Sequence, residues 1–215
     1  MARIDAALVA CATPRRPSRR GWPLVAVVWC AAGAMLTAVS GCAAPPGTTV
    51  QTVDAVDVDR YVGKWFEIAR FPNSFQDECV GGVTAAYALR SDGRLDVINQ
   101  CQTGSGPIEA RGVARIVDTG TRARLKVRFA PAVFSFLPFV WGDYWILGLA
   151  RDYSWAVVGS PEREYLWILA RTPALDWERY TLALATASGN GFAAERLVQT
   201  SHASAVAPEE RGGRN

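Results

Sequence analysis

Residues 61–72 read YVGKWFEIARFP, a short run in which bulky apolar side chains follow a glycine and precede a proline. β-branched and aromatic residues are enriched in β-strands, and glycine and proline mark the ends of such segments. The stretch therefore predicts a strand over residues 64–71. The rest of the chain repeats this kind of segment, so the strand is the unit from which the fold is built.

Seven further segments of this kind follow, separated by turn signals such as Ser91-Asp92-Gly93. They cover residues 83–89, 95–101, 110–117, 124–129, 144–149, 155–159 and 165–170. Strands and helices do not alternate, which favours an antiparallel sheet. Eight antiparallel strands joined by short turns most economically close into an up-and-down barrel, so the predicted fold class is all-β.

One amphipathic segment, residues 176–187, predicts a single C-terminal helix. Its apolar face is suited to packing on the outside of the barrel and consists of Leu175, Tyr180, Leu184 and Ala187. Residues 197–200 predict a short last strand, and residues 203–215 predict a disordered tail.

Three short motifs occupy set places in this strand order: the start of the first strand, the turn between the sixth and seventh, and the end of the eighth. They are Gly63-Lys64-Trp65, Asp152-Tyr153 and Arg171. Over residues 53–200 their order and spacing resemble the lipocalin family, and within it the bacterial outer-membrane lipoproteins of the Blc type. The resemblance implies that Trp65 plugs the closed end of the barrel while Arg171 crosses its ring and binds nearby carbonyls. The family's usual Thr-Asp-Tyr reads Arg151-Asp152-Tyr153 here.

The strand order brings Trp65 and Arg171 together without any appeal to the family. If the first strand runs upward from Trp65, the eighth runs downward and ends at Arg171. We expect a structural cation–π contact there, not a catalytic one. The same parity places the turns at 91–93, 118–120 and 151–152 at the closed end. It places the loops at 72–80, 102–109, 130–143 and 160–164 at the open mouth.

Strand alternation also predicts the inner lining, because successive side chains point to opposite faces. In residues 124–129, Lys126 and Arg128 are expected to face water, which turns the alternate side chains inward. The predicted ligand-binding residues are Val83, Ala85, Tyr87, Val97, Asn99, Leu125, Val127, Phe129, Tyr144, Ile146, Tyr165 and Trp167. This apolar lining suits a long acyl chain, since each buried CH₂ contributes about 0.8 kcal/mol. The alternative is that these side chains fill a solid core.

Arg70 and Arg111 are the cations that could assist a ligand headgroup near the mouth, whereas Glu67 is expected at the surface or rim. The loop within FAPAVFSFLPFVWGDYW, residues 129–145, is unusually apolar for a mouth loop. Three roles stay open for it: contact with a membrane, a lid over the mouth, or a homodimer interface. Its predicted contact residues are Phe134, Phe136, Leu137, Phe139 and Trp141.

The first 41 residues have the pattern of a secretory signal, with four arginines at 15, 16, 19 and 20 and no charge over residues 22–39. The following Val39-Ser40-Gly41-Cys42 resembles the lipobox of bacterial lipoproteins. The resemblance implies lipidation of Cys42 and a lipidated tether over residues 42–53, before a barrel domain at 54–202. Ala43 favours outer-membrane placement, facing the periplasm. The alternative is a single membrane-spanning anchor.

Export leaves Cys79 and Cys101 in an oxidising compartment. A disulfide between them would close a loop of about 20 residues and contribute roughly 3 kcal/mol. Two free thiols or a metal pair are the alternatives. The disulfide is the prediction, because no histidine or third cysteine lies nearby in the sequence.

Composition argues against several other functions. Of the net charge of +3, residues 1–41 carry +4 and the remainder −1, so no basic field is left to attract nucleic acid. The single histidine, His202, lies near the C-terminus, and the sequence has no nucleophile motif, phosphate loop or metal-ligand spacing. We therefore expect neither an enzyme nor a metal or other cofactor.

The resemblance implies a membrane-anchored lipocalin that stores or transports fatty acids, such as palmitate, or lysophospholipids for envelope maintenance. The sequence itself supplies an apolar chamber, a mouth and an anchor. Two alternatives stay open: a structural envelope lipoprotein with a filled barrel, and a lipocalin-type isomerase.

Overall fold

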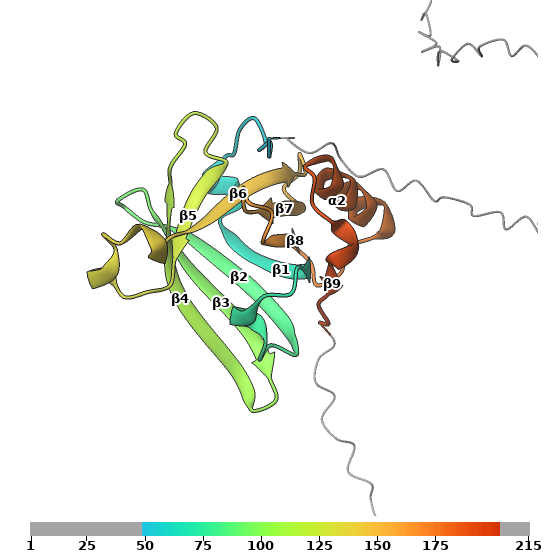
Figure 1. The fold of residues 1–215 in the computed structure, drawn as a ribbon, viewed down its shortest axis with the longest axis horizontal. Coiled ribbons are helices and arrows are strands. Elements are labelled where there is room, and N and C mark those ends of the chain that lie inside the picture. The colour runs from blue at the N-terminus through green and yellow to red at the C-terminus, as the bar shows by residue number, and fades with distance from the viewer. Residues whose placement is uncertain (1–48, 203–215) are drawn as a thin grey trace, which may run out of the picture. The chain divides into compact units, whose positions relative to one another are not determined.

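The computed structural model describes residues 49–202 (Figure 1). The predicted signal over residues 1–41, the lipidation of Cys42 and the tail over 203–215 lie outside the described residues. Within residues 49–202 every strand of the barrel pairs with its neighbours on both sides.

Eight strands form a closed antiparallel up-and-down barrel, which confirms the predicted fold class. The barrel closes because β1 pairs with both β2 and β8. A further strand of two residues, β9 (Val198–Gln199), pairs with the mouth half of β1. The barrel strands are β1 (Gly63–Arg70), β2 (Gly81–Leu89), β3 (Leu95–Thr103), β4 (Gly106–Ile116), β5 (Arg124–Arg128), β6 (Gly142–Leu149), β7 (Trp155–Gly159) and β8 (Leu166–Ala170).

The helical elements lie around this barrel. Helix α2 (Trp177–Gly189) begins after Asp176, whose carboxylate accepts a hydrogen bond from the Arg179 amide and so caps the helix. A short α1 (Val58–Tyr61) precedes β1. Four 3₁₀ turns lie in connecting segments: η1 (Ser74–Gln76), η2 (Ala132–Phe134), η3 (Pro138–Val140) and η4 (Ala194–Arg196).

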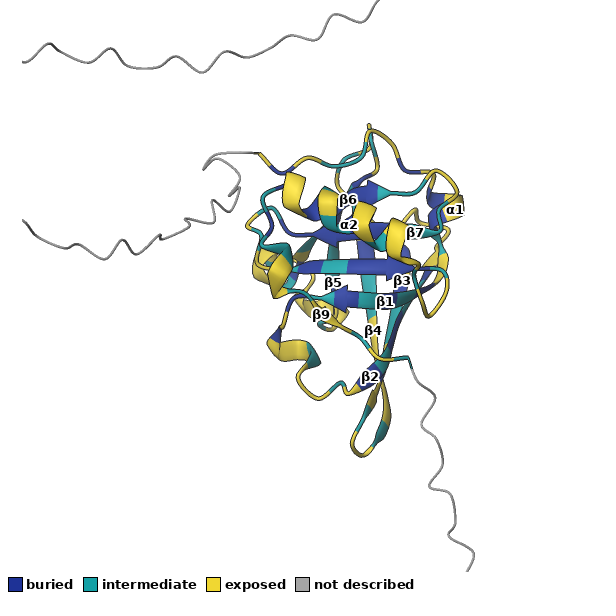
Figure 2. Ribbon diagram, turned by 90° about the vertical axis from the view of Figure 1, so that its right-hand side faces the viewer, coloured by how far each residue is buried: buried dark blue, intermediate teal, exposed yellow. Residues whose placement is uncertain are grey.

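Helix α2 packs against the outer face of β6 and β7, as predicted, and leaves its other side exposed (Figure 2). Ala183 and Ala187 are its buried contacts, with Tyr180 and Leu184 half-buried beside them. A β-carbon at Gly148 of β6 would lie 2.8 Å from the Thr186 methyl group, so the glycine permits this close approach. The barrel wall therefore separates two cores, one inside the barrel and one beneath the helix.

The chain enters the barrel domain beside the loop that joins β7 to β8, which is a mouth loop. The Gln51 amide donates to Asn190 Oδ1 at 2.7 Å, and Arg163 of that loop donates to the Asn190 carbonyl at 2.7 Å. Val50 is buried in the outer core, and the Val53 amide donates to the Ile146 carbonyl. Residues 49–53 thus differ from the predicted tether: apolar burial holds them on the barrel wall.

Cys79 and Cys101 form the predicted disulfide, with their Cα atoms 5.7 Å apart. Cys101 lies on the inner face of β3, whereas Cys79 lies in the loop between β1 and β2. The bond therefore ties a mouth loop, including η1, to the barrel wall.

Candidate functional site in the barrel interior

The closed end of the barrel is built on Trp65 and Arg171. Trp65 is fully buried and donates from Nε1 to the Tyr61 carbonyl at 2.8 Å. The Arg171 guanidinium carbon lies 3.8 Å from the centre of the Trp65 ring. Arg171 also donates to the backbone carbonyls of Arg60, Tyr61, Lys64 and Tyr153. A group committed to so many structural bonds closes the base and is not available to a ligand.

The other motif residues support the same end. Gly63 has a φ of +95°, a left-handed conformation that glycine adopts without strain, and it lies beside the Arg171 guanidinium. The Tyr153 hydroxyl accepts a hydrogen bond from the Asp57 amide at 2.8 Å. Asp152 accepts from the amide and hydroxyl of Ser154, and these bonds lower the pKa of its carboxyl.

Three tyrosines fill the interior above Trp65. The Tyr144 hydroxyl lies 2.8 Å from that of Tyr61 and 2.9 Å from that of Tyr87. Burial raises the pKa of all three phenols, that of Tyr87 to about 12. They stay neutral at physiological pH and can satisfy one another's hydroxyls, so this trio forms a polar but uncharged floor.

The register of the strands places the predicted lining residues on the inner face. Leu125 opposes Tyr144, Tyr87 opposes Val97, and Ala85 opposes Asn99. Phe129 is 45% exposed, yet its ring occupies the space over Gly112, which lies opposite the buried Val97. Val83 and Ile146 are buried, Val127 packs on the inner core, and Tyr165 stacks on Trp167 with ring centres 5.8 Å apart. Their role in ligand binding stays a prediction.

Arg128 corrects the expectation that it faces water. Its side chain does lie on the outer side of β5, but it is only 6% exposed. Trp141 covers it, with the Arg128 guanidinium carbon 5.2 Å from the indole ring and that of Arg115 at 4.4 Å. Strand alternation gave the side correctly, whereas the covering loop was not foreseeable from the strand alone.

Trp141 is also a correction to the predicted mouth contacts, because it is buried. Its Nε1 donates to the Ser135 carbonyl at 2.8 Å, which fixes the loop carrying η2 and η3 to the outer wall. Phe134, Phe136 and Phe139 are exposed and Leu137 is half-buried. The loop therefore stands out from the side of the barrel beside β5 (Figure 1), an arrangement that speaks against the lid alternative.

Sequence reasoning missed a buried acid on the inner face. Glu67 is 2% exposed and accepts hydrogen bonds from Gln76 at 2.7 Å and Thr200 at 2.6 Å. Burial raises its pKa, against the opposing effect of these bonds and of Arg70. Arg70 lies 3.5 Å from Glu67, whereas Arg111 pairs with Glu109 on the exposed outer face of β4. The sequence did contain a signal for this burial: Glu67 lies two residues after Trp65, on the same face of the strand.

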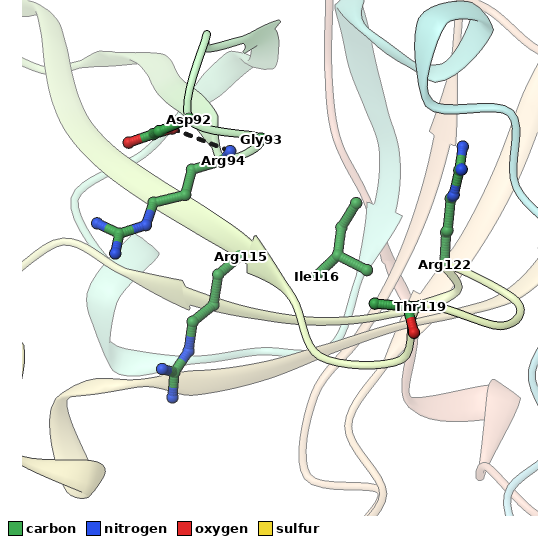
Figure 3. Close-up of a pocket in the computed structure, with 7 residues that line it drawn as sticks. All are labelled: Asp92, Gly93, Arg94, Arg115, Ile116, Thr119 and Arg122. Atoms are coloured by element: carbon green, nitrogen blue, oxygen red, sulfur yellow. Dashed lines mark hydrogen bonds between the residues drawn. The ribbon is translucent and has the colours of Figure 1, made fainter.

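A surface hollow at the closed end is separate from this interior (Figure 3). The turns β2–β3 and β4–β5 form it, and it contains none of the predicted ligand-binding residues. Its lining is Asp92, Gly93, Arg94, Arg115, Ile116, Thr119 and Arg122. Within residues 49–202 there is no cluster of three or more side chains suited to hold a metal ion. None of the helices described is long and apolar enough to cross a bilayer.

Comparison with known proteins agrees with this geometry. Residues 56–202 match the model of a lipocalin-like domain. The chain belongs to the lipocalin family. This lipocalin is 39% identical over 178 residues to the outer membrane lipoprotein Blc of Escherichia coli K12, covering 82% of this chain and 94% of that protein. It is 35% identical over 171 residues to temperature-induced lipocalin-1 of Arabidopsis thaliana, covering 76% and 91%.

Solved structures agree in fold. Insecticyanin from the tobacco hornworm superposes with a TM-score of 0.58 at 20% identity, covering 73% of this chain and 86% of its own. Lobster apocrustacyanin A1 gives 0.55 at 18%, covering 74% and 94%. At these identities the likeness concerns the barrel alone.

Proposed function

We propose that this lipocalin is a membrane-anchored carrier that stores or transports fatty acids or lysophospholipids. The observation that carries the proposal is the division of its interior. An aromatic floor closes one end, an apolar wall follows, and the charged pair Glu67–Arg70 lies in the mouth half. That order of polarity matches an amphiphile inserted chain first, with its headgroup at the mouth.

The proposed location is the outer membrane, facing the periplasm. The relationship to a protein named as an outer membrane lipoprotein supports it, as does Cys42 at the end of an apolar segment. Cys42 lies seven residues before Thr49, where the described chain begins beside a mouth loop. Seven residues span at most about 25 Å, so lipidation of Cys42 would hold the mouth close to the bilayer.

We further propose that the bilayer is what the exposed aromatic loop contacts. Phe136 and Phe139 are 76% and 80% exposed, and Phe75 and Val80 of the β1–β2 mouth loop are also exposed. Apolar side chains exposed on the loops of a tethered protein suit insertion between lipid headgroups. A homodimer formed through the same loop is the competing occupant.

Native mass spectrometry of the chain from residue 43 onward tests the carrier function. We expect one palmitate or one lysophospholipid per barrel, in a monomer. A barrel that accepts neither lipid would overturn the proposal in favour of a structural envelope protein with a filled core. Turnover of the bound lipid would point to a lipocalin-type isomerase instead.

A further inference from the structure

The inner face of the described barrel carries one acidic side chain and one cationic side chain. Among the eight described barrel strands, Glu67 and Arg70 of β1 are the charged side chains that point inward. The cations of β4 and β5 alternate with lining residues and therefore point outward, as Arg111, Arg115 and Lys126 do. A lone pair of opposite charges in the mouth half of an otherwise uncharged interior needs a physical explanation, because burying charge costs free energy.

A β-bulge in β1 produces this placement. Glu67 opposes Leu169 of the inner core, but the next pairing joins Ala69 to Ile168, which belongs to the outer core. Arg70 then opposes Trp167 and turns inward. Regular alternation from Trp65 would have sent Arg70 to the outside, so the extra residue re-aims one side chain, as bulges near binding sites often do.

The two charges are satisfied unequally. Glu67 accepts hydrogen bonds from both Gln76 and Thr200. The Arg70 guanidinium, which has five donors, makes one 3.4 Å hydrogen bond to the Gln76 carbonyl and its 3.5 Å ion pair with Glu67. The ion pair is made by the buried Nε, which donates no hydrogen bond in residues 49–202. The buried Oδ1 of Asn99, on the same inner face, also has no hydrogen-bond partner there.

Aromatic rings border Arg70 on the mouth side. Trp167, opposite Arg70, donates from Nε1 to Gln76 Oε1 at 3.2 Å. The Phe75 ring packs 5.6 Å from that of Tyr165 and 6.3 Å from that of Trp167. Arg70 thus stands where an apolar wall meets unsatisfied polar groups, which is where the headgroup of a bound amphiphile would begin.

We propose that Arg70 binds an anionic oxygen, of a carboxylate or a phosphate, in the headgroup of an amphiphile, and that Glu67 positions Arg70 for this contact. The inference rests on the proposed carrier function and adds a charge preference to it. Arg70 draws the anion in through its free donors. Glu67 orients the guanidinium and, being negative, also limits how strongly an anion binds.

Isothermal titration calorimetry on the chain from residue 43 onward tests this subsite with charged and neutral partners of equal chain length. Palmitate is compared with 1-hexadecanol, and palmitoyl lysophosphatidic acid with monopalmitoylglycerol. The wild type should bind at least one anionic member roughly tenfold more tightly than its neutral partner. The first pair reports a carboxylate and the second a phosphate.

Substitutions that remove either the positive or the negative charge of the pair then separate a binding role from a structural one. Arg70→Gln should abolish the charge preference while leaving hexadecanol binding intact. Glu67→Gln, which replaces the carboxylate with a neutral amide of similar shape, should increase the preference. The double substitution removes both charges, leaves no unpaired buried charge and should also abolish it. Arg111→Gln, on the exposed outer face of β4, should leave the preference unchanged.

The outcomes distinguish the subsite from the carrier function. Equal binding of anionic and neutral amphiphiles by the wild type, or an unchanged preference in Arg70→Gln, would overturn the subsite and leave the carrier standing. A fall in preference in Glu67→Gln would assign the pair a structural role only. Binding of no amphiphile would overturn the carrier function, and the subsite with it.

Discussion

The indole of Trp141 packs on the outer wall of the barrel, with the guanidinium carbon of Arg115 4.4 Å from its ring centre. This contact determines where the apolar mouth loop goes. A tryptophan that pointed into the mouth would have made the loop a lid. Held on the outside, it leaves Phe136 and Phe139 exposed.

Replacing Trp141 with alanine should release this loop and lower the free energy of unfolding by about 3 kcal/mol, because a buried indole and its stacking are lost. Urea denaturation measures the change, and hydrogen exchange over residues 131–140 reports the release. Trp177→Ala removes an indole that is 78% exposed and should change neither quantity appreciably. Equal effects of the two substitutions would contradict a pinning role for Trp141.

The double substitution Phe136→Ser and Phe139→Ser should reduce partitioning of the chain from residue 43 onward onto phospholipid vesicles, roughly tenfold or more. Vesicle co-sedimentation measures this. Trp177→Ser and Leu182→Ser, on the exposed side of α2, are the matched control and should have little effect. If sedimentation velocity instead shows a dimer that the phenylalanine substitutions dissociate, the loop is an interface between copies.

Arg171→Lys keeps the positive charge at the base but loses most of the bonds to the backbone carbonyls, because an ammonium cannot reproduce the guanidinium fork. We expect a loss of about 2 kcal/mol in the free energy of unfolding, with amphiphile affinity nearly unchanged in the protein that remains folded. Arg179→Lys, at an exposed ion pair, serves as the control. A selective loss of affinity would show that the base takes part in binding.

Tyr144→Phe should cost about 1–3 kcal/mol, since it leaves the hydroxyls of Tyr61 and Tyr87 buried without their shared partner. The raised pKa of the three phenols also predicts alkaline instability. The folded protein favours the neutral phenols, so this stability is present below pH 10 and is lost as the pH rises toward about 12. Absorbance at 295 nm follows the ionisation alongside unfolding, and Tyr165→Phe provides a control outside the trio.

The buried carboxyl of Glu67 should make folding less favourable as the pH rises. Its pKa is raised in the folded state, so the folded protein holds the proton more tightly than the unfolded chain does. The associated stability is present below the usual range of glutamate and is lost as the pH rises through the higher folded value. The unfolding free energy of the wild type minus that of Glu67→Gln should therefore decrease from pH 4 to pH 8. A difference that is constant or increases over this range would contradict the assignment.

Much of this architecture was accessible from local pattern. Strand alternation predicted the inner face at Leu125 and Val127, and chain parity alone brought Trp65 to Arg171, because both follow from the geometry of regular antiparallel strands. The expectations that were wrong share a cause, which is contact with a distant segment. A loop covers Arg128, and Glu67 accepts hydrogen bonds from two other segments. Val50 is held at the end of a helix some 140 residues away in the sequence, where its neighbour Gln51 donates to Asn190. The alternation of one strand contains no information about such contacts.

The bulge at Ile68 separates two properties that ordinary strands keep together: how far a residue lies along the wall and which way it faces. Deleting Ile68 would remove the bulge but keep the pairs Glu67–Leu169, Ala69–Ile168 and Arg70–Trp167, so Arg70 would still face inward. The direction of Arg70 therefore follows from its partner in β8. The extra residue lets two successive side chains, Ile68 and Ala69, both pack in the outer core while the acid before them and the cation after them face the interior.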